Sequence, residues 1–427
     1  MKFLCPIFLF LLITYSINCF ALSKSENEIV VPIDYTTIQD AINAASPYDV
    51  IYVKSGVYKE KLLVDKPLFI RGVAGETVSI VTEDDADIIT IEASNVTVSN
   101  FLISRSVGFS SKSAGVRLSN ASCCVIENNT IVGNFIGVLI EGGSLNLVQN
   151  NVITMNRYGI FVRRYQHYVE SYSNVIFNNL ITNNSWNGIE IDWGGANNVS
   201  SNTISYNFAF GLEIPDYTPS SLNVIYHNNF VGNADAFGTV YQAYAPENNY
   251  WNFSGEGNYW SDFHGVDENY DAISDLPYIP SRNVIDYFPL MGAFQTFEVC
   301  NYNLNIISNA STYEFSYSIT NDESQLFVIN LLISSDSEWF ARISLPKHFY
   351  SFSSIEVNGS SYECRNFTEN DSYINLYLNC SSGVYVVRIY GFLISESLLV
   401  CTLLVMFVYS VLLRYRKFWR YTKNIKA

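Results

Sequence analysis

Acidic side chains recur on one face of a series of short strands that each begin with glycine. Glu190 and Glu213 stand two residues after such a glycine, and Asp192 stands four residues after one. Equivalent residues of neighbouring parallel strands lie about 4.8 Å apart. We therefore predict that these carboxylates form a cluster with Arg163, which takes the Asp192 position one strand earlier.

Such a cluster suits chemistry on sugars. Two carboxyl groups about 5 Å apart are typical of retaining glycoside hydrolases, and crowding raises one pKa so that this group acts as the acid. The same carboxylates with a bound cation and an arginine base would suit a polysaccharide lyase. Two interpretations without turnover remain open. The face could bind sugar through aromatic stacking and hydrogen bonds. Alternatively, it could be a solvated β-face whose opposite charges neutralise one another.

A second candidate site is an acidic loop that resembles a calcium-binding loop. Oxygen-bearing side chains stand at its positions 1, 3, 5 and 9, which are Asp267, Asn269, Asp271 and Asp275. Ala272 replaces the usual glycine, and Tyr278 replaces the usual glutamate. The loop is therefore either a calcium site or an Asp-rich turn held by its own hydrogen bonds.

The strands that carry the acidic cluster belong to an internal repeat. The repeat is marked by glycines at intervals of 22, 22, 29, 23 and 27 residues: Gly115, Gly137, Gly159, Gly188, Gly211 and Gly238. An apolar strand follows each of the first five, and an Asn-rich turn with a second apolar pair comes later in the unit. A repeat of this length predicts a solenoid whose units bury their apolar faces against one another.

The strand pattern selects one kind of solenoid. Strands of three to five residues are too short for helical hairpins, and leucine is too sparse for a leucine-rich repeat. The apolar residues share one phase, so we expect a dry column of Val138, Ile160, Ile189 and Leu212. Recurrent turn asparagines suit stacked amides that bond from coil to coil. These features predict an all-β protein built on a right-handed parallel β-helix.

The β-helix is predicted to cover residues 30–293, and a second domain follows it. A capping box at Thr36–Gln39 and the apolar face Ile38, Ala41, Ile42 and Ala45 indicate a helix that closes the first coil. Residues 240–293 are rich in tyrosine and tryptophan and are expected to plug the other end. Alternating strands in residues 295–388 predict a β-sandwich.

Both ends of the chain carry apolar segments. Residues 1–22 resemble a secretion signal peptide. Tyr390–Leu413 is long and apolar enough to be a transmembrane helix, and the tail 414–427 contains six basic residues. The positive-inside rule places that tail in the cytoplasm. We therefore expect a single-pass membrane protein at the cell surface, with an extracellular N-terminal ectodomain.

Charge and composition restrict the classes of partner and the covalent modifications that we expect for this protein. The formal net charge is −16 although the tail is basic, so no basic face is available for nucleic acid. Cys364 and Cys380 could join as a disulfide in an oxidising exterior. Asn-x-Ser/Thr sequons predict glycosylation in a secreted chain, and the predicted sites are Asn95, Asn120, Asn252, Asn309, Asn358, Asn366, Asn370 and Asn379. The sequons at Asn128, Asn183 and Asn198 lie in the repeat turns, where asparagine has a structural use.

Two motifs resemble a known family. The opening Thr37-Ile-Gln-Asp-Ala-Ile-Asn-Ala-Ala45 with Asp49-Val-Ile-Tyr-Val53, and the closing Gly257-Asn-Tyr-Trp-Ser-Asp-Phe263 with Asp286-Tyr-Phe-Pro-Leu-Met291, resemble NosD-like β-helix proteins. The resemblance implies a pectin-lyase-like solenoid of the carbohydrate-binding and sugar-hydrolysis type. The namesake of the family is a periplasmic accessory to a copper enzyme. Residues 303–390 resemble a β-sandwich module that precedes the C-terminal anchor of archaeal surface proteins.

The function expected from these observations is binding of a polysaccharide or cell-surface glycan by an acidic β-helix face on a membrane-anchored protein. The first alternative is an extracellular polysaccharide lyase or glycoside hydrolase that uses Glu190, Asp192, Glu213 and Arg163. The second is metal delivery like that of the family's namesake, although histidine, cysteine and methionine do not cluster in the sequence. Calcium is the one cofactor that the sequence suggests.

Overall fold

The computed structural model of the chain describes residues 27–393 except 106–111, 167–168, 235–237, 239–241, 300–301, 320–325, 348–349, 365 and 371. The chain divides into two compact units. Unit 1 comprises Met1–Glu268 and Ile273–Phe294, and unit 2 comprises Asn269–Ala272 and Gln295–Ala427. The predicted signal peptide and the basic tail lie outside the described residues.

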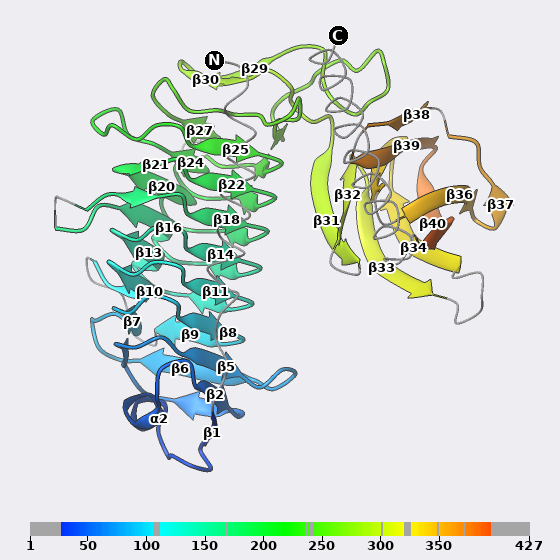
Figure 1. Cartoon of the computed structure of the whole chain (residues 1–427). Coiled ribbons are helices and arrows are strands. Elements are labelled where there is room, and N and C mark those ends of the chain that lie inside the picture. Colours follow the sequence, from blue (N-terminus) through cyan, green and yellow to red (C-terminus); the bar gives the residue numbers. More distant parts are fainter. Residues whose placement is uncertain are drawn as a thin grey trace, which may run out of the picture. The chain divides into compact units, whose positions relative to one another are not determined.

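Unit 1 is a parallel β-helix, which confirms the predicted all-β solenoid, and Figure 1 shows its stacked coils. Sheet 1 contains β1 (Glu28–Val31), β2 (Val50–Val53), β5 (Phe69–Gly72), β8 (Thr97–Ser99), β11 (Val125–Glu127), β14 (Leu147–Gln149), β18 (Val175–Phe177), β22 (Asn198–Ser200) and β25 (Val224–Tyr226). Sheet 2 contains β4 (Leu62–Val64), β7 (Ile89–Ile91), β10 (Ala114–Ser119), β13 (Ile136–Glu141), β16 (Tyr158–Arg163), β20 (Ile189–Asp192), β24 (Leu212–Glu213) and β27 (Ala243–Tyr244). Sheet 3 contains β3 (Gly56–Tyr58), β6 (Val78–Thr82), β9 (Leu102–Arg105), β12 (Thr130–Val132), β15 (Val152–Thr154), β19 (Leu180–Thr182), β23 (Thr203–Ser205), β26 (Asn229–Val231) and β28 (Tyr259–Trp260). Two short additions are the pair β17 (Ser171–Tyr172) with β21 (Gly194–Gly195) and the hairpin β29 (Tyr278–Ser281) with β30 (Val284–Asp286).

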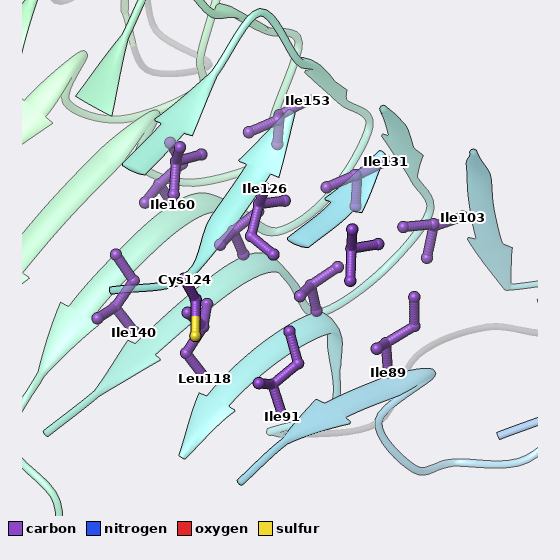
Figure 2. Close-up of a cluster of buried hydrophobic side chains, with 14 of the residues drawn as sticks. Ile89, Ile91, Ile103, Leu118, Cys124, Ile126, Ile131, Ile140, Ile153 and Ile160 are labelled. Carbon is purple, nitrogen blue, oxygen red and sulfur yellow. The ribbon is translucent and has the colours of Figure 1, made fainter. Parts of the chain in front are cut away.

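The predicted apolar column forms the interior of the β-helix. Val138 pairs in register with Ile160, Ile160 with Ile189, and Ile189 with Leu212, and all four side chains are fully buried. Figure 2 shows how the three sheets contribute to this core, with Ile126 from sheet 1, Ile140 from sheet 2 and Ile153 from sheet 3. Burial of this apolar surface is the main force that holds successive coils together.

Buried asparagines form ladders at the corners between the sheets. In each ladder the side-chain amide N–H of one asparagine donates to the side-chain oxygen of the asparagine one coil later, at 2.9–3.2 Å. The same oxygen accepts the backbone N–H of the earlier asparagine. The three ladders run through Asn129, Asn151, Asn179, Asn202, Asn228 and Asn258, through Asn146, Asn174, Asn197, Asn223 and Asn249, and through Asn134, Asn156, Asn184, Asn207 and Asn233.

The first five repeat glycines, from Gly115 to Gly211, occupy a position that has no room for a side chain. A Cβ built on Gly137 would lie 2.5 Å from the Gly159 carbonyl oxygen and 2.6 Å from the Ile153 side chain. A Cβ on Gly188 would lie 2.7 Å from the Gly211 carbonyl oxygen. The glycine spacing therefore marks the position where one coil passes closest to the next.

The two ends of the β-helix are closed as the sequence suggests, with one correction. Helix α2 (Ile38–Ala44) buries Ile38, Ala41 and Ile42 over the first coil. Its N-cap is Thr37 and not Thr36: the Thr37 hydroxyl accepts the backbone N–H of Asp40 at 3.1 Å. The Glu60 carboxylate accepts the backbone N–H groups of Ile38 and Gln39, the first two of the helix, and the Gln39 side chain accepts the Leu63 N–H instead of completing the predicted capping box.

Aromatic side chains plug the C-terminal end of the β-helix. Trp251 and Trp260 are almost fully buried, and the Trp260 ring stacks on Phe230 at 4.4 Å. Asp286 accepts hydrogen bonds from the Trp260 indole at 2.9 Å and from the Asn258 backbone at 2.7 Å. Burial raises the pKa of Asp286 to about 6.

Unit 2 is built from two antiparallel sheets. One contains β31 (Ala293–Val299), β32 (Tyr302–Ser308), β35 (Trp339–Pro346), β39 (Tyr373–Cys380) and β38 (Asn366–Glu369). The other contains β33 (Ser311–Ile319), β34 (Leu326–Ser335), β40 (Gly383–Leu393), β36 (Tyr350–Val357) and β37 (Ser360–Ser361). Trp339, Ile343, Leu376 and Ile389 belong to their shared buried core.

The start of the predicted membrane span differs from the structure. Strand β40 continues through Tyr390 to Leu393, where Tyr390 pairs with Val328, so the first residues of the predicted membrane span complete a sheet. The rest of that span lies outside the described residues. Within the described part of the chain, no helix is long and apolar enough to cross a bilayer.

The disulfide that Cys364 and Cys380 could form is not present in this structure. Both residues are free thiols that pack against the core of unit 2. Burial raises the pKa of Cys364 to about 11 and also raises the pKa of Cys380, so both groups are kept as uncharged thiols.

The asparagine ladders predict how the free energy of unfolding changes when one of their members is replaced. The Asn179 amide donates to the backbone oxygens of Val148 and Phe177 and to the Asn202 side chain, and its oxygen accepts from Asn151. Asn179→Ala leaves several of these buried groups without partners, and we expect it to lower the free energy of unfolding by about 3 kcal/mol. Urea denaturation of the protein measures this change.

Asn178→Gly is the matched control. Asn178 is exposed and has a φ of 52° that glycine adopts readily, and among the described residues its side chain donates only to Asn150. We expect its effect to stay below about 1 kcal/mol. Equal losses for the two variants would contradict a special role for the buried ladder.

Candidate functional site

Sheet 2 brings two of the predicted acidic residues side by side on its outer face. Phe161 pairs in register with Glu190, and Glu190 pairs with Glu213 on the next strand. Arg163 pairs with Asp192 in the neighbouring row. The carboxylate row therefore runs along the β-helix axis over β20 and β24.

Asn187 joins the two glutamates. Its side-chain amide nitrogen lies 2.8 Å from Glu190 Oε2 and 2.6 Å from Glu213 Oε2, and both contacts are hydrogen bonds. Its oxygen accepts the backbone N–H of Phe210 at 3.0 Å, which fixes the orientation of the amide. Because both oxygens contact the same nitrogen, the distance between Glu190 Oε2 and Glu213 Oε2 cannot exceed the sum of these two hydrogen-bond lengths.

Our sequence analysis did not single out Asn187, although the repeat contained a signal for it. The residue before the repeat glycine is apolar or aromatic in the other units, where it is Ala114, Ile136, Tyr158 or Phe210. Asn187 is the polar exception. A fully buried asparagine in a position that its neighbours fill with apolar groups is retained because it has specific partners.

Burial gives Glu190 unusual acid–base properties. The residue is only 7% exposed. Burial raises its pKa to about 7, the negative charges of Glu213 and Asp192 act in the same direction, and the Asn187 hydrogen bond opposes them. Burial also raises the pKa values of Glu213 and Asp192. Glu190 can therefore hold or release a proton near neutral pH, as a general acid must.

Arg163 belongs to a separate row of ion pairs. Its guanidinium contacts Glu141 at 2.8 Å, and Glu141 also contacts Arg117 at 2.7 Å. Arg117 pairs in turn with Asp87 at 2.5 Å. Burial raises the pKa of Asp192, and the charges of Arg164 and, after it, Arg163 oppose that rise, although Arg163 itself forms its ion pair with Glu141. The sequence analysis placed Arg163 in the acidic cluster, whereas in the structure Arg163 forms its ion pair with Glu141 in the neighbouring row.

Aromatic and cationic groups surround the carboxylates. The Arg157 guanidinium lies over the rings of Phe135, Tyr158 and Trp186 at 5.1–5.9 Å, and Trp186 is 43% exposed. At the other end of the same strands, the Arg164 guanidinium lies 3.7 Å from the centre of the Trp193 ring. Ring faces of this kind stack on sugars, and the guanidinium groups hold them in place.

Tyr217 stands beside the acidic row from the segment after β24. Its side chain is 71% exposed. Partial burial and, after it, the charges of Asp192, Glu190 and Glu213 raise its pKa to about 12. Tyr217 therefore keeps its proton and offers a hydroxyl donor and a ring face to a ligand on sheet 2.

The predicted calcium ligands are divided between the two units. Asp267 and Asp275 belong to unit 1, and Asn269 and Asp271 belong to unit 2. Asp275 accepts the Glu268 backbone N–H at 2.9 Å, a turn contact of the kind that the alternative interpretation requires. Among the described residues, no group of three or more His, Cys, Asp or Glu side chains is placed to hold a metal ion.

The structure places most of the predicted glycosylation sites at the surface. Asn120, Asn309, Asn358, Asn370 and Asn379 are exposed, and Asn95 and Asn252 are partly exposed. The side chain of Asn366 lies outside the described residues. Exposure is necessary for glycosylation but does not demonstrate it, so glycosylation of these asparagines remains a prediction.

The fold and this face define the class of the protein: a parallel β-helix with an acidic, aromatic outer sheet. The chain belongs to the family described as periplasmic copper-binding protein (NosD), whose model matches residues 42–265. The resemblance of the opening and closing motifs to that family is thereby confirmed.

Two curated relatives are similar to part of the chain. A cell surface glycoprotein of Methanothermus fervidus is 30% identical over 242 residues, which are 56% of this chain and 36% of the relative. A probable ABC transporter binding protein NosD of Stutzerimonas stutzeri is 42% identical over 62 residues, which are 14% of this chain and 13% of the relative. The chain thus matches about a third or less of each relative.

Solved structures with similarity include two carbohydrate-active enzymes. A pectin methylesterase of Aspergillus niger is 17% identical with a TM-score of 0.29, and the match covers 53% of this chain and 92% of that one. An alginate lyase of Paenibacillus is 14% identical with a TM-score of 0.30, and covers 55% and 76%. Similarities at this level carry no information about activity.

The described residues do not fit a copper site. Copper prefers sulfur and imidazole ligands gathered at one place. Cys124 is buried in the β-helix core, where burial raises its pKa to about 12. His227 is bonded to Glu256 at 2.6 Å and stacks on Phe294. We therefore assign no copper-dependent step to this chain.

Glu190 predicts a pH dependence of stability. Its pKa rises from an ordinary value of 4.5 to about 7 on folding, so the folded state favours the protonated form. That stabilisation is full below pH 4.5 and is lost as the pH rises through about 7. Glu190→Gln stays neutral, and we expect it to gain on the order of 2 kcal/mol over the wild type between pH 4 and pH 8.

Denaturation of both proteins across this pH range measures the difference. Glu127→Gln, which removes a carboxylate from sheet 1, is the control for a general effect of charge. Parallel stability curves for the wild type and Glu190→Gln would show that Glu190 titrates normally.

Proposed function

We propose that the outer face of sheet 2 binds a glycan, and that the protein is a surface-located β-helix binder. The observation that supports this proposal most strongly is the combination on one rigid face of exposed rings and half-buried carboxylates. Trp186 and Tyr217 supply ring faces, and Glu213 and Asp192 supply hydrogen-bond acceptors. Asp192 and Glu213 lie on strands β20 and β24, and Trp186 and Tyr217 lie in the turns next to these strands, so a glycan on the outer face of sheet 2 would contact all four residues.

The proposed location is extracellular, with attachment to the membrane. The names of the two curated relatives, a cell surface glycoprotein and a transporter binding protein, support this location. The apolar residues that follow β40, together with the basic tail, support attachment through a C-terminal transmembrane helix. Asparagines exposed on both units would then carry the predicted glycans.

Glycoside hydrolysis is the second candidate, and one observation favours it. Glu190 is a buried acid with a pKa of about 7, and Glu213 is held close to it by Asn187. In a retaining mechanism Glu190 would protonate the glycosidic oxygen while Glu213 attacked the anomeric carbon. A lyase reaction has less support, because the Arg163 guanidinium pairs with Glu141.

Binding can be tested with a panel of immobilised acidic, neutral and amino-sugar polysaccharides. We expect the protein to be retained, and Trp186→Ala to weaken retention about tenfold, as expected when a ring that stacks on sugar is lost. Leu180→Ala is the control, because Leu180 is equally exposed but lies on sheet 3. Equal losses for both variants, or no retention at all, would contradict the proposal.

The same incubations separate binding from turnover. New reducing ends in the soluble fraction would favour the hydrolase, and products that absorb in the ultraviolet would favour the lyase. Retention without either product favours the binder.

Calcium binding by Asp267, Asn269, Asp271 and Asp275 is also proposed. Ala272, which replaces the glycine of calcium loops, nevertheless takes the left-handed φ of 65° that this position requires. Calorimetric titration with calcium should give a saturable heat that is absent in Asp267→Ala/Asp271→Ala. Superimposable titrations of the wild type and the double variant would contradict a calcium site in this loop.

A further inference from the structure

The paired glutamates on sheet 2 lack a cationic partner. Glu190 and Glu213 share the single Asn187 amide, and no lysine or arginine of the described residues forms an ion pair with either group. The second oxygen of Glu190 accepts no hydrogen bond from a described residue and is open to solvent, whereas Asp192 Oδ1, in the neighbouring row, is buried without a hydrogen-bond partner. A buried carboxylate without such a partner is destabilising unless a ligand supplies one.

Neighbouring cations are engaged elsewhere. Arg163 and Arg117 both pair with Glu141 in the adjacent row. Arg157 and Arg164 lie over aromatic rings at the two ends of the strands. The face therefore separates its positive groups at the margins from a negative centre at Glu190 and Glu213.

Tyrosine rings complete the surroundings of this negative centre. Tyr158 stacks on Phe161 at 5.4 Å, and Phe161 pairs in register with Glu190. Burial raises the pKa values of both Tyr158 and Tyr217, and the charges of Glu190 and Glu213 act in the same direction. Carboxylates combined with aromatic ring faces are the groups that proteins use to bind an ammonium ion. A sugar acid would instead be repelled by the same centre.

We propose that the glycan bound by sheet 2 is an amino sugar with a free amine, and that its ammonium group is held between Glu190 and Glu213. This inference rests on the proposed function, since it names the ligand class of the same face. The ammonium would donate to the free oxygen of Glu190 and to Glu213. The sugar ring would lie against Tyr217 or Tyr158.

The test compares two probes of equal length, a fully deacetylated glucosamine oligosaccharide and its N-acetylated counterpart. Affinity is measured by calorimetry near pH 7, where part of the sugar amine is protonated and where Glu190, with a pKa of about 7, can give up its proton to bind the ammonium group. We expect the free-amine oligosaccharide to bind at least about tenfold more tightly, the difference typical of one charge-assisted hydrogen bond. Glu190→Gln and Glu213→Gln should each abolish this preference.

Glu127→Gln distinguishes a specific site from general attraction between a polycation and an acidic protein. It removes the same charge from sheet 1, and the preference for the free amine should survive it. Loss of the preference in all three variants would overturn the inference. So would equal affinity for the two probes, or binding of another glycan but neither probe, and both of these results would leave glycan binding intact. Failure to bind any glycan would overturn the proposed function itself.

Discussion

Hydrogen bonding between asparagine amides of successive coils is the constraint on which the rest of the structure depends. Each buried asparagine satisfies the backbone groups of its own corner and the side chain of the next coil, so a coil cannot slip by one residue without leaving several buried groups unpaired. The apolar interior tolerates small shifts, because dispersion and burial are not directional. Register is therefore set by the ladders, and the outer rows of sheet 2 inherit it.

The acidic centre of sheet 2 shows how this register creates unusual chemistry. Glu190 and Glu213 are neighbours only because their strands are in register, and Asn187 reaches both because it lies at the same corner as the repeat glycine. An apolar cluster of Ala114, Ile136 and Leu139 occupies the preceding coils of the same outer face. The carboxylates thus lie at the end of a dry patch, and that position accounts for the burial that raises their pKa values.

The sequence was sufficient for the architecture because glycine spacing, strand phase and turn asparagines repeat. The column from Val138 to Leu212 and the adjacency of Glu190 and Glu213 follow from the period alone. The period does not determine side-chain rotamers: Arg163 could face Asp192 or Glu141, and it pairs with Glu141. Asn187 was missed because its role depends on contacts with two other strands, and the end of β40 was missed because strand and membrane-span residues share the same apolar composition.

The ladders also have a consequence for how such a molecule can change in length. Within the ladders each asparagine donates to the next coil and accepts from the previous one, so internal rungs are equivalent. Excision or duplication of one complete unit, such as the 22 residues that separate Gly137 from Gly159 and contain Asn146, Asn151 and Asn156, would rejoin equivalent ladder positions and leave each ladder amide with a partner. The β-helix is in this sense a modular rod, which can lengthen or shorten by whole coils while its two closed ends stay the same.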